Sequence, residues 1–371
     1  MASVYWPANW NPAANPGTRP RRIAVIPGDG IGPEVVNGGR QVIQHIMQID
    51  PTVQLTMDEF PWSSAYFRAH GRMMPPDGLD ILRDYDAIYF GAVGDPALPP
   101  DVPVWGLILP IRQALQLSVN LRPIRYFPGV RSVLKELPAD GLDIIIVREN
   151  TEGEYAGQGG WLFPKTPREV ALQVAVYSRP AIEQVVRYAF ELARRLHKRC
   201  TSISKANALN YAGRLWDTVF EEIGRDYPDV KRETVLVDAA ALYLVMQPQR
   251  FEIMVTPNLF GDILSDLGAG LVGGLGLAAS ANFNPAGGVP GFFEPVHGSA
   301  PDIAGRGIAN PLAAIWAAAM MLGYLGYNAW EEKIVQAMAT LLAESDVKPV
   351  DLGGHASTQD VVDALIALLS R

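Results

Sequence analysis

The chain has 371 residues, of which 49% are hydrophobic and 19% charged, and its formal net charge at pH 7 is −8. This length suffices for one large or two modest domains with a substantial core. The negative charge argues against a nucleic-acid-binding protein, which needs a basic face, and no apolar run approaches the roughly 20 residues of a membrane helix.

The N-terminal segment and the cysteine content indicate where such a protein works. Residues 1–20 are rich in Pro, Asn and Ala and contain no continuous apolar region of the signal-peptide kind. We therefore predict a flexible tail, with a docked arm as the alternative. The single cysteine, Cys200, rules out an internal disulfide, fits the reducing cytoplasm and is expected to be a small core residue.

Short apolar runs alternate with longer amphipathic stretches along the chain. The predicted strands cover residues 22–27, 87–93, 143–147, 235–237 and 253–255. The predicted helices cover residues 31–47, 180–197, 206–223, 259–275, 311–325 and 330–344. This alternation predicts an α/β protein with a largely parallel sheet. Because no low-complexity linker interrupts it, we expect the chain to pass between two lobes without a clean break.

The first predicted strand runs into a glycine-rich turn, VIPGDGIGPEV, with Gly28, Gly30 and Gly32 two residues apart. A dinucleotide-binding fingerprint needs the spacing G-x-G-x-x-G and an acidic residue about 20 residues further on. Here the third glycine comes one place early, and Asp50, at about the right distance, precedes Pro51. We therefore predict a tight strand-to-helix turn. The alternative is that its backbone N–H groups face an anionic group of a nucleotide.

Two carboxylates stand four residues apart in NLFGDILSDLGAG, at Asp262 and Asp266. This spacing places both on one helix face, where like charges repel and a hard divalent cation would compensate them. The alternative is a solvated acidic face, but Leu, Ile and Gly flank the pair rather than Lys or Glu. A third carboxylate, Asp238, is expected at the end of the strand ETVLVDA, a position where α/β active sites collect.

Three arginines, a lysine and a tyrosine are further candidate residues of a functional site. Arg112, Arg122 and Arg148 suit bidentate carboxylate recognition, although each alone could be a structural ion pair. Lys205, in SISKAN, is expected to open a helix, and Tyr155 follows the acidic stretch ENTEGE. Near a metal either could carry protons. A solvent-facing lysine and a packed tyrosine are the alternatives.

Six motifs now occur in one order: IPGDGIGPE, NLRP, VRENTEGEYAG, SKAN, NLFGDILSDL and EPVHGSAPDIAGRGIANP. Together they resemble the metal-dependent β-decarboxylating dehydrogenases, which include the isopropylmalate, isocitrate, homoisocitrate, tartrate and D-malate dehydrogenases. The resemblance runs from about Ile23 to the C-terminal helix and implies a cytoplasmic oxidoreductase.

The resemblance implies a two-domain α/β fold of the isopropylmalate-dehydrogenase type, distinct from the Rossmann fold. A large cofactor-binding domain would comprise residues 21–117 and 274–371. A small domain, residues 118–273, would carry the dimer contacts and the metal and substrate residues. The cofactor would lie along residues 297–311, with the glycine turn beside it as a helper.

The resemblance also assigns roles to the residues singled out above. Arg112, Arg122 and Arg148 would clamp the carboxylates of a malate-like substrate. Mg²⁺ or Mn²⁺ would bind Asp262 and Asp266 together with Asp238 of the second chain, and K⁺ is an optional further ion. A homodimer is implied, because Asp238 and Lys205 would come from the second chain. The catalytic residues would be Lys205, which takes the proton of the C2 hydroxyl, Tyr155, which protonates the enolate after CO₂ leaves, and Asp238.

The resemblance predicts NAD rather than NADP as the cofactor. Asp302 and Ile303 stand where NADP-dependent relatives carry a Lys–Tyr type pair, and an acidic residue there would repel a 2′-phosphate. The residues assigned to cofactor binding are His297, Gly298, Ser299, Ala300, Asp302, Ile303, Asn310 and Glu294.

The substrate pocket should be formed by the residues just before Arg112, namely Trp105, Ile108 and Leu109. Isocitrate enzymes place Ser and Asn at the positions of Gly106 and Ile108, so isocitrate is not expected. The stretches 105–109, 71–79 and 86–94 look most like the tartrate and D-malate branch. Apolar Ile108 and Leu109 keep 3-isopropylmalate as the alternative. A non-catalytic regulatory subunit is a remote alternative, because the Lys, Tyr and Asp residues of the site are all present.

Overall fold

The computed structural model describes residues 5–6, 20–138 and 141–371, which form two compact units. Unit 1 comprises Met1–Leu117, Arg122–Asp143 and Gly268–Arg371, and unit 2 comprises Ser118–Leu121 and Ile144–Leu267. Residues 122–143 and 268–273, which the resemblance places in the small domain, thus belong to unit 1. The predicted α/β fold with largely parallel strands is confirmed.

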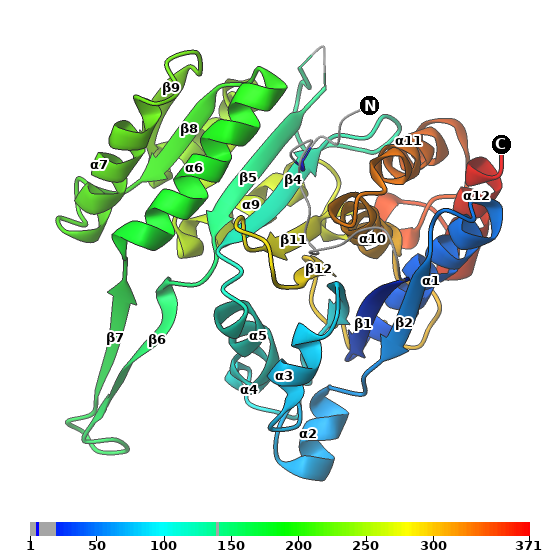
Figure 1. Ribbon diagram of the computed structural model, residues 1–371, viewed down its shortest axis with the longest axis horizontal. Coiled ribbons are helices and arrows are strands. Elements are labelled where there is room, and N and C mark those ends of the chain that lie inside the picture. Colours follow the sequence, from blue (N-terminus) through cyan, green and yellow to red (C-terminus); the bar gives the residue numbers. More distant parts are fainter. Residues whose placement is uncertain (1–4, 7–19, 139–140) are drawn as a thin grey trace. The chain divides into compact units, whose positions relative to one another are not determined.

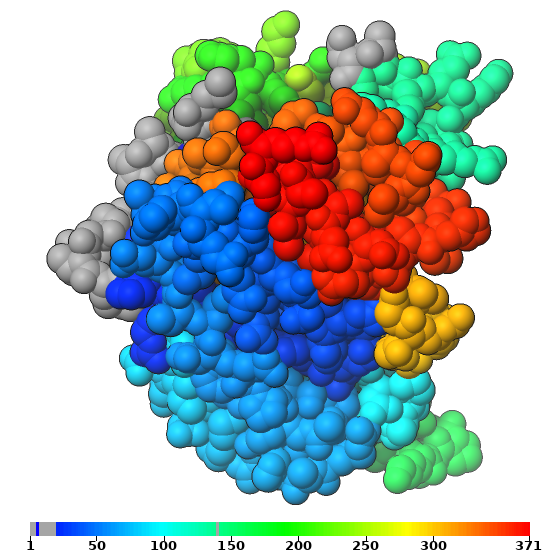
Figure 2. All heavy atoms as spheres, turned by 90° about the vertical axis from the view of Figure 1, so that its right-hand side faces the viewer, coloured from blue at the N-terminus to red at the C-terminus, as the bar shows by residue number. Residues whose placement is uncertain are grey.

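Unit 1 contains five neighbouring strands in the order β2-β1-β3-β12-β11 (Figure 1). All pairs are parallel except β11 with β12. Its elements are β1 (Arg21–Gly28), α1 (Gly32–Ile49), β2 (Leu55–Glu59), α2 (Ser64–His70), α3 (Gly78–Arg83), β3 (Ala87–Ala92), α4 (Asp101–Pro103), η1 (Val104–Ile108), α5 (Leu109–Ala114), η3 (Leu275–Leu277), β11 (Ala279–Phe283), β12 (Gly291–Pro295), α10 (Leu312–Tyr324), α11 (Asn328–Glu344), η4 (Val350–Leu352) and α12 (Thr358–Leu369). The first helix, α1, packs against the last, α12, and Figure 2 shows this face in blue and red.

Unit 2 contains the parallel strands β5-β10-β8-β9 in that order. A separate antiparallel ribbon, β6–β7, extends from it (Figure 1). Its elements are β5 (Asp143–Glu149), β6 (Gly153–Leu162), β7 (Val170–Val176), α6 (Arg179–Leu196), β8 (Cys200–Ser204), α7 (Ala212–Gly224), β9 (Arg232–Leu236), α8 (Val237–Met246), η2 (Pro248–Arg250) and β10 (Ile253–Thr256). The chain changes unit four times: just before β4 (Val119–Arg125), within β4, at the start of β5 and within α9 (Asn258–Leu271).

The predicted strands and helices are confirmed in type, and three local predictions are corrected. Helix α7 begins at Ala212, because residues 206–211 form turns, which the two asparagines in ANALNY favour. Asp238 does not end a strand: β9 stops at Leu236, and Asp238 lies in the first turn of α8, where a carboxylate complements the helix dipole. Helix α10 is buried on every side rather than amphipathic, since it contains no charged residue.

One aromatic residue of the N-terminal segment is docked. Trp6 is 1% exposed and makes edge contacts with Phe283, Tyr324 and Phe293, at centroid distances of 5.0, 5.3 and 6.4 Å. Such aromatic pairs stabilise a core beyond the area they bury. The predicted flexible tail therefore does not hold at this residue, where the arm is the better description. Residues 1–4 and 7–19 lie outside the described part of the chain.

The glycine turn is a tight connection from β1 to α1, as predicted. Gly30 has a positive φ of 58°, and a Cβ atom there would lie 1.9 Å from the carbonyl oxygen of Ser299. The N–H of Ile31 donates to that same carbonyl at 2.8 Å. The Asp29 carboxylate accepts the N–H groups of Ser64 and Gly94 at 2.8 and 3.0 Å. Glycine is thus required because two backbone segments touch here.

Substitution of Gly30 by alanine separates the cost of this contact from that of the left-handed backbone. Gly71 is the matched control, because its φ is 70° but nothing lies within 4 Å of an added Cβ. We expect Gly71→Ala to cost about 1 kcal/mol of unfolding free energy and Gly30→Ala at least about 2 kcal/mol more. Urea denaturation of both variants measures the difference. Equal losses would mean that the Ser299 contact is unimportant.

Candidate active site

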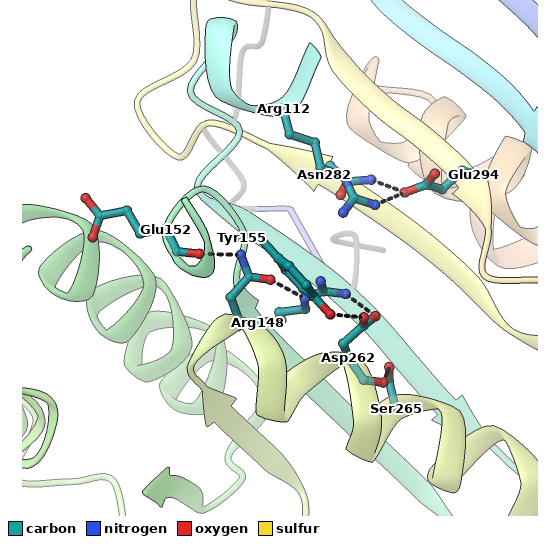
Figure 3. A network of polar contacts seen from close by, with 9 residues as sticks. Arg112, Arg148, Glu152, Tyr155, Asp262, Ser265, Asn282 and Glu294 are labelled. Atoms are coloured by element: carbon teal, nitrogen blue, oxygen red, sulfur yellow. Dashed lines mark hydrogen bonds and ion pairs between the residues drawn. The ribbon is translucent and has the colours of Figure 1, made fainter. Parts of the chain in front are cut away.

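The two carboxylates predicted to bind metal lie on α9 and differ in their surroundings. Asp266 is exposed, whereas Asp262 is half-buried and engaged on both oxygens. Its Oδ1 accepts the Nη1 of Arg148 at 2.5 Å, and its Oδ2 accepts the hydroxyl of Tyr155 at 3.0 Å (Figure 3). The structure therefore brings together one residue from each of three predicted groups: a carboxylate binder, a metal ligand and a proton carrier.

Arg148 is held in this cluster by a residue that the sequence did not single out. It is the next-to-last residue of β5 and only 2% exposed, and its Nε donates to Oδ1 of Asn258 at 2.9 Å. The Nδ2 of Asn258 donates in turn to the backbone oxygen of Glu152 at 2.8 Å. Asn258 thus joins the start of α9 to the loop after β5. The only sequence signal for it is its place as the first residue of the α9 motif NLFGDILSDL.

The loop after β5 is shaped by a buried carboxylate. Glu149 accepts the N–H groups of Thr151 and Glu152 and the hydroxyl of Thr151, at 2.6 to 3.2 Å. Burial raises the pKa of Glu149 above its usual range, although these hydrogen bonds act in the opposite direction. Glu149 therefore builds the turn that carries the chain from Arg148 to Tyr155.

Lys205 and Asp238 form a second polar cluster in unit 2. The Nζ of Lys205 lies 2.7 Å from Oδ1 of Asp238, and this hydrogen bond lowers the pKa of Asp238. Lys205 follows β8 and lies in a turn, rather than at the start of a helix as predicted. Over residues 5–6, 20–138 and 141–371, no three metal-ligating side chains gather within the chain. A single chain thus does not bring Asp238 together with Asp262 and Asp266.

In unit 1, Arg112 forms a buried ion pair with Glu294. Its Nη2 lies 2.6 Å from Oε1 of Glu294, which also accepts the Nδ2 of Asn282 at 3.0 Å (Figure 3). The Nε of Arg112 is buried and has no hydrogen-bond partner in the described part of the chain. Glu294, assigned above to cofactor binding, is here the counter-charge of a substrate arginine. Arg122 is likewise buried, on β4.

The residues expected to form the substrate pocket lie just before Arg112 in unit 1. Trp105 is 42% exposed on η1. Ile108 is half-buried and packs against the apolar core of unit 1, and Leu109 is buried. Gly106 is close to Met73, whose Cγ would lie 2.5 Å from an added Cβ. Of the three predicted pocket residues, Trp105 is thus the one most available to a ligand.

Two polar side chains of the segment 297–311, His297 and Asp302, are candidates for contact with a ligand. The Nδ1 of His297 lies 3.0 Å from the carbonyl of Gly298, whereas its Nε2 is buried without a hydrogen-bond partner in the described residues. Burial lowers the pKa of His297, which favours the neutral ring. Asp302 is exposed.

The rest of this segment is anchored in unit 1. Ser299 is buried, and Ala300 and Ile303 pack against the apolar cluster at the start of α1. The Nδ2 of Asn310 donates to Oδ2 of Asp351 at 3.1 Å, and burial raises the pKa of that carboxyl. Asp351 is a second residue that the sequence did not reveal, since it lies 41 positions away.

No helix in the described ranges is long and apolar enough to cross a membrane. The described chain thus combines two α/β units, buried arginines beside carboxylates and a glycine turn that is not of the Rossmann type. Residues 22–365 match the family described as isocitrate/isopropylmalate dehydrogenase. The chain belongs to this family of β-decarboxylating dehydrogenases, oxidoreductases that generally use NAD(P) and a divalent metal.

Individual relatives agree with the family assignment but differ in their substrates. The chain is 42% identical to a probable tartrate dehydrogenase/decarboxylase of Bacillus subtilis, over 94% of this chain and 98% of that one. It is 47% identical to a 3-isopropylmalate dehydrogenase of Thermobifida fusca, over 92% and 96%. The crystal structure of isocitrate dehydrogenase from Methylococcus capsulatus superimposes with a TM-score of 0.85 at 36% identity, covering 95% of this chain and all of that one.

A double-mutant cycle tests the buried pair Arg112–Glu294. Because each single change strands a buried charge, we expect Arg112→Met and Glu294→Gln each to cost about 3 kcal/mol of unfolding free energy. The double variant should lose no more than either single variant. The exposed pair Arg83–Asp80 is the control and should show a coupling below about 0.5 kcal/mol. Additive losses at Arg112 and Glu294 would contradict the pairing.

Proposed function

We propose that the chain is an NAD-dependent, divalent-metal-dependent dehydrogenase that oxidises and β-decarboxylates a malate-type 2-hydroxy diacid, with D-malate or tartrate as substrate. The cluster of Arg148, Tyr155 and Asp262 carries this proposal. In this cluster Arg148, which can bind a substrate carboxylate, and Tyr155, which can donate a proton, both contact Asp262, a carboxylate that can hold a metal ion. Oxidation at C2 followed by loss of the C3 carboxylate needs these three groups at neighbouring atoms.

The side chains of the chain fit the two groups that this reaction requires, a divalent cation and NAD. Asp262 and Asp266 offer the carboxylate oxygens that Mg²⁺ and Mn²⁺ prefer. His297 Nε2 and the exposed Asp302 would serve NAD, since Asp302 can accept ribose hydroxyls and would repel a 2′-phosphate. When bound, the dinucleotide supplies the oxidant and the cation a Lewis acid at the C2 oxygen.

The chain's own residues would bind the diacid and move its protons. The guanidinium groups of Arg112, Arg122 and Arg148 would hold the substrate carboxylates. Lys205, as the neutral amine left after it releases a proton to solvent, would take the proton of the C2 hydroxyl. Asp238, 2.7 Å from its Nζ, would hold that nitrogen in place. Tyr155 would deliver its hydroxyl proton to C3 once CO₂ has left.

A homodimer with shared sites would unite the carboxylates that one chain keeps apart. Unit 2 exposes many large apolar side chains, which a solvated monomer rarely does in clusters. On the β6–β7 ribbon they are Trp161, Leu162, Val170, Leu172 and Val174, with Phe163 just beyond β6, on α8 Leu242, Val245 and Met246, and on α9 Ile263. Because Asp238 lies on α8 and Asp262 on α9, contacts through these helices would bring Asp238 and Lys205 of one chain to Asp262 of the other.

The choice among substrates rests on the residues before Arg112. The half-exposed Trp105 would fill the space that a larger C3 substituent needs, which favours D-malate and tartrate. The second candidate is 3-isopropylmalate. It is favoured by the apolar Ile108 and by the similarity to the Thermobifida fusca enzyme.

Initial rates of NADH formation with Mn²⁺ decide between these substrates. We expect D-malate or a tartrate to give the highest kcat/KM, ahead of 3-isopropylmalate and isocitrate. NADP should be at least about 100-fold poorer than NAD, because Asp302 repels the 2′-phosphate. A preference for 3-isopropylmalate would overturn the substrate choice alone. Comparable efficiency with NADP would overturn the role of Asp302.

Replacement of the proposed base tests the proton-transfer step. Lys205→Met should lower kcat about 1,000-fold, the usual contribution of a positioned base, and leave NADH binding unchanged. Lys231→Met, at an exposed lysine of the same unit, should keep normal turnover. Near-normal turnover by Lys205→Met would contradict the assignment.

A further inference from the structure

Glu34, at the end of the glycine turn, is a carboxylate that the proposed reaction does not use. It lies in the first turn of α1 and is half-buried. Its Oε1 accepts the N–H of Ala309 at 2.9 Å and also contacts the hydroxyl of Thr358. Ala309 and Thr358 are both buried, so these groups have no access to water as a substitute partner.

These contacts tie three separate parts of unit 1 together. Thr358 begins α12, its hydroxyl lies 2.7 Å from the carbonyl of Ala309, and its N–H donates to the carbonyl of Gly307 at 2.9 Å. Helices α1 and α12 lie against each other at the surface (Figure 2). Glu34 thus fixes the far end of segment 297–311 to both helices.

The near end of the same segment is held by the same turn. The carbonyl of Ser299 accepts the N–H of Ile31 and lies where a side chain at Gly30 would stand. The N–H of Gly32 donates to the carbonyl of Asp29. Because the chain itself uses these N–H groups, the turn is not arranged as a phosphate cradle. Residues 28–34 instead hold both ends of segment 297–311.

We propose that Glu34 is a positioning residue for the dinucleotide, acting through segment 297–311; the proposal rests on the proposed function, which assigns that segment to NAD. Ala309 immediately precedes Asn310, whose side chain is bonded to Asp351. Displacement of Ala309 would therefore move Asn310 and loosen the segment that begins at His297. The carboxylate of Glu34 would hold the segment that binds the cofactor in place, and it would form its hydrogen bonds with the protein and not with the cofactor.

The test is the dissociation constant of NADH, measured by fluorescence titration of the full-length protein. Glu34→Ala should raise this constant and the KM for NAD about tenfold, since a buried N–H loses a charged acceptor. The kcat at saturating NAD and the KM of the diacid should stay within about twofold. Glu34→Gln keeps an acceptor oxygen for Ala309 and should recover most of the binding.

Asp50→Ala is the matched control at the other end of α1. The Asp50 carboxylate accepts the Nε1 of Trp330 at 2.7 Å and the N–H of Thr52 at 3.0 Å, but it does not contact segment 297–311. This variant should lower the Tm but leave the dissociation constant of NADH unchanged. If Glu34→Ala does not fold, Thr358→Val carries the test, with a smaller shift in the same direction.

Three outcomes overturn the inference. Unchanged NADH binding in the Glu34 or Thr358 variant would show that the contact does not position the segment. An equal loss in Asp50→Ala would show that general destabilisation of α1 is the cause. A wild-type protein that does not bind NADH would overturn the proposed cofactor together with this inference, whereas the first two outcomes leave the proposed function intact.

Discussion

The buried guanidinium of Arg148 requires a counter-charge, and the polar part of unit 2 is arranged around that requirement. A charge 2% exposed is costly unless it is paired and fully hydrogen-bonded. Asp262 supplies the charge and Asn258 the second acceptor, which fixes the start of α9 against the loop after β5. Under the proposed function, a substrate carboxylate would take the place of Asp262 beside Arg148. Binding of the substrate would then release Asp262 from Arg148, so that Asp262 becomes available to bind the metal ion.

Unit 1 also contains a buried arginine whose charge is neutralised by a carboxylate. Arg112 is neutralised by Glu294, and Asn282 holds that carboxylate from the neighbouring strand. The two arginines differ in what remains open. Both oxygens of Asp262 are engaged, whereas Arg112 keeps a buried Nε without a partner in the described residues. Under the proposed function, Arg112 could therefore donate from Nε to a substrate carboxylate while keeping its ion pair with Glu294.

The sequence predicted what depends on neighbours along the chain and missed what depends on distant ones. Strands such as β1 and β3 and most helices follow from local hydrophobic patterns, and six motifs were enough to identify the family. Asn258, Asn282 and Asp351 were missed because each acts through a side chain more than ten positions away. The β6–β7 ribbon was not predicted, although the alternation of Val170, Leu172 and Val174 is itself a strand signal. All three side chains are exposed in the structure.

The glycine turn shows why a motif has to be interpreted through what it touches. Gly28, Gly30 and Gly32 resemble a nucleotide-binding loop because both arrangements need a backbone free of side chains. In a phosphate loop the approaching group is the ligand. Here it is the carbonyl of Ser299, which belongs to the segment proposed to bind the ligand. Glycine is thus needed here for the close approach of a protein carbonyl, and not for the approach of the cofactor itself. A glycine pattern alone identifies a close approach, and the chemistry of the approaching atom decides its role.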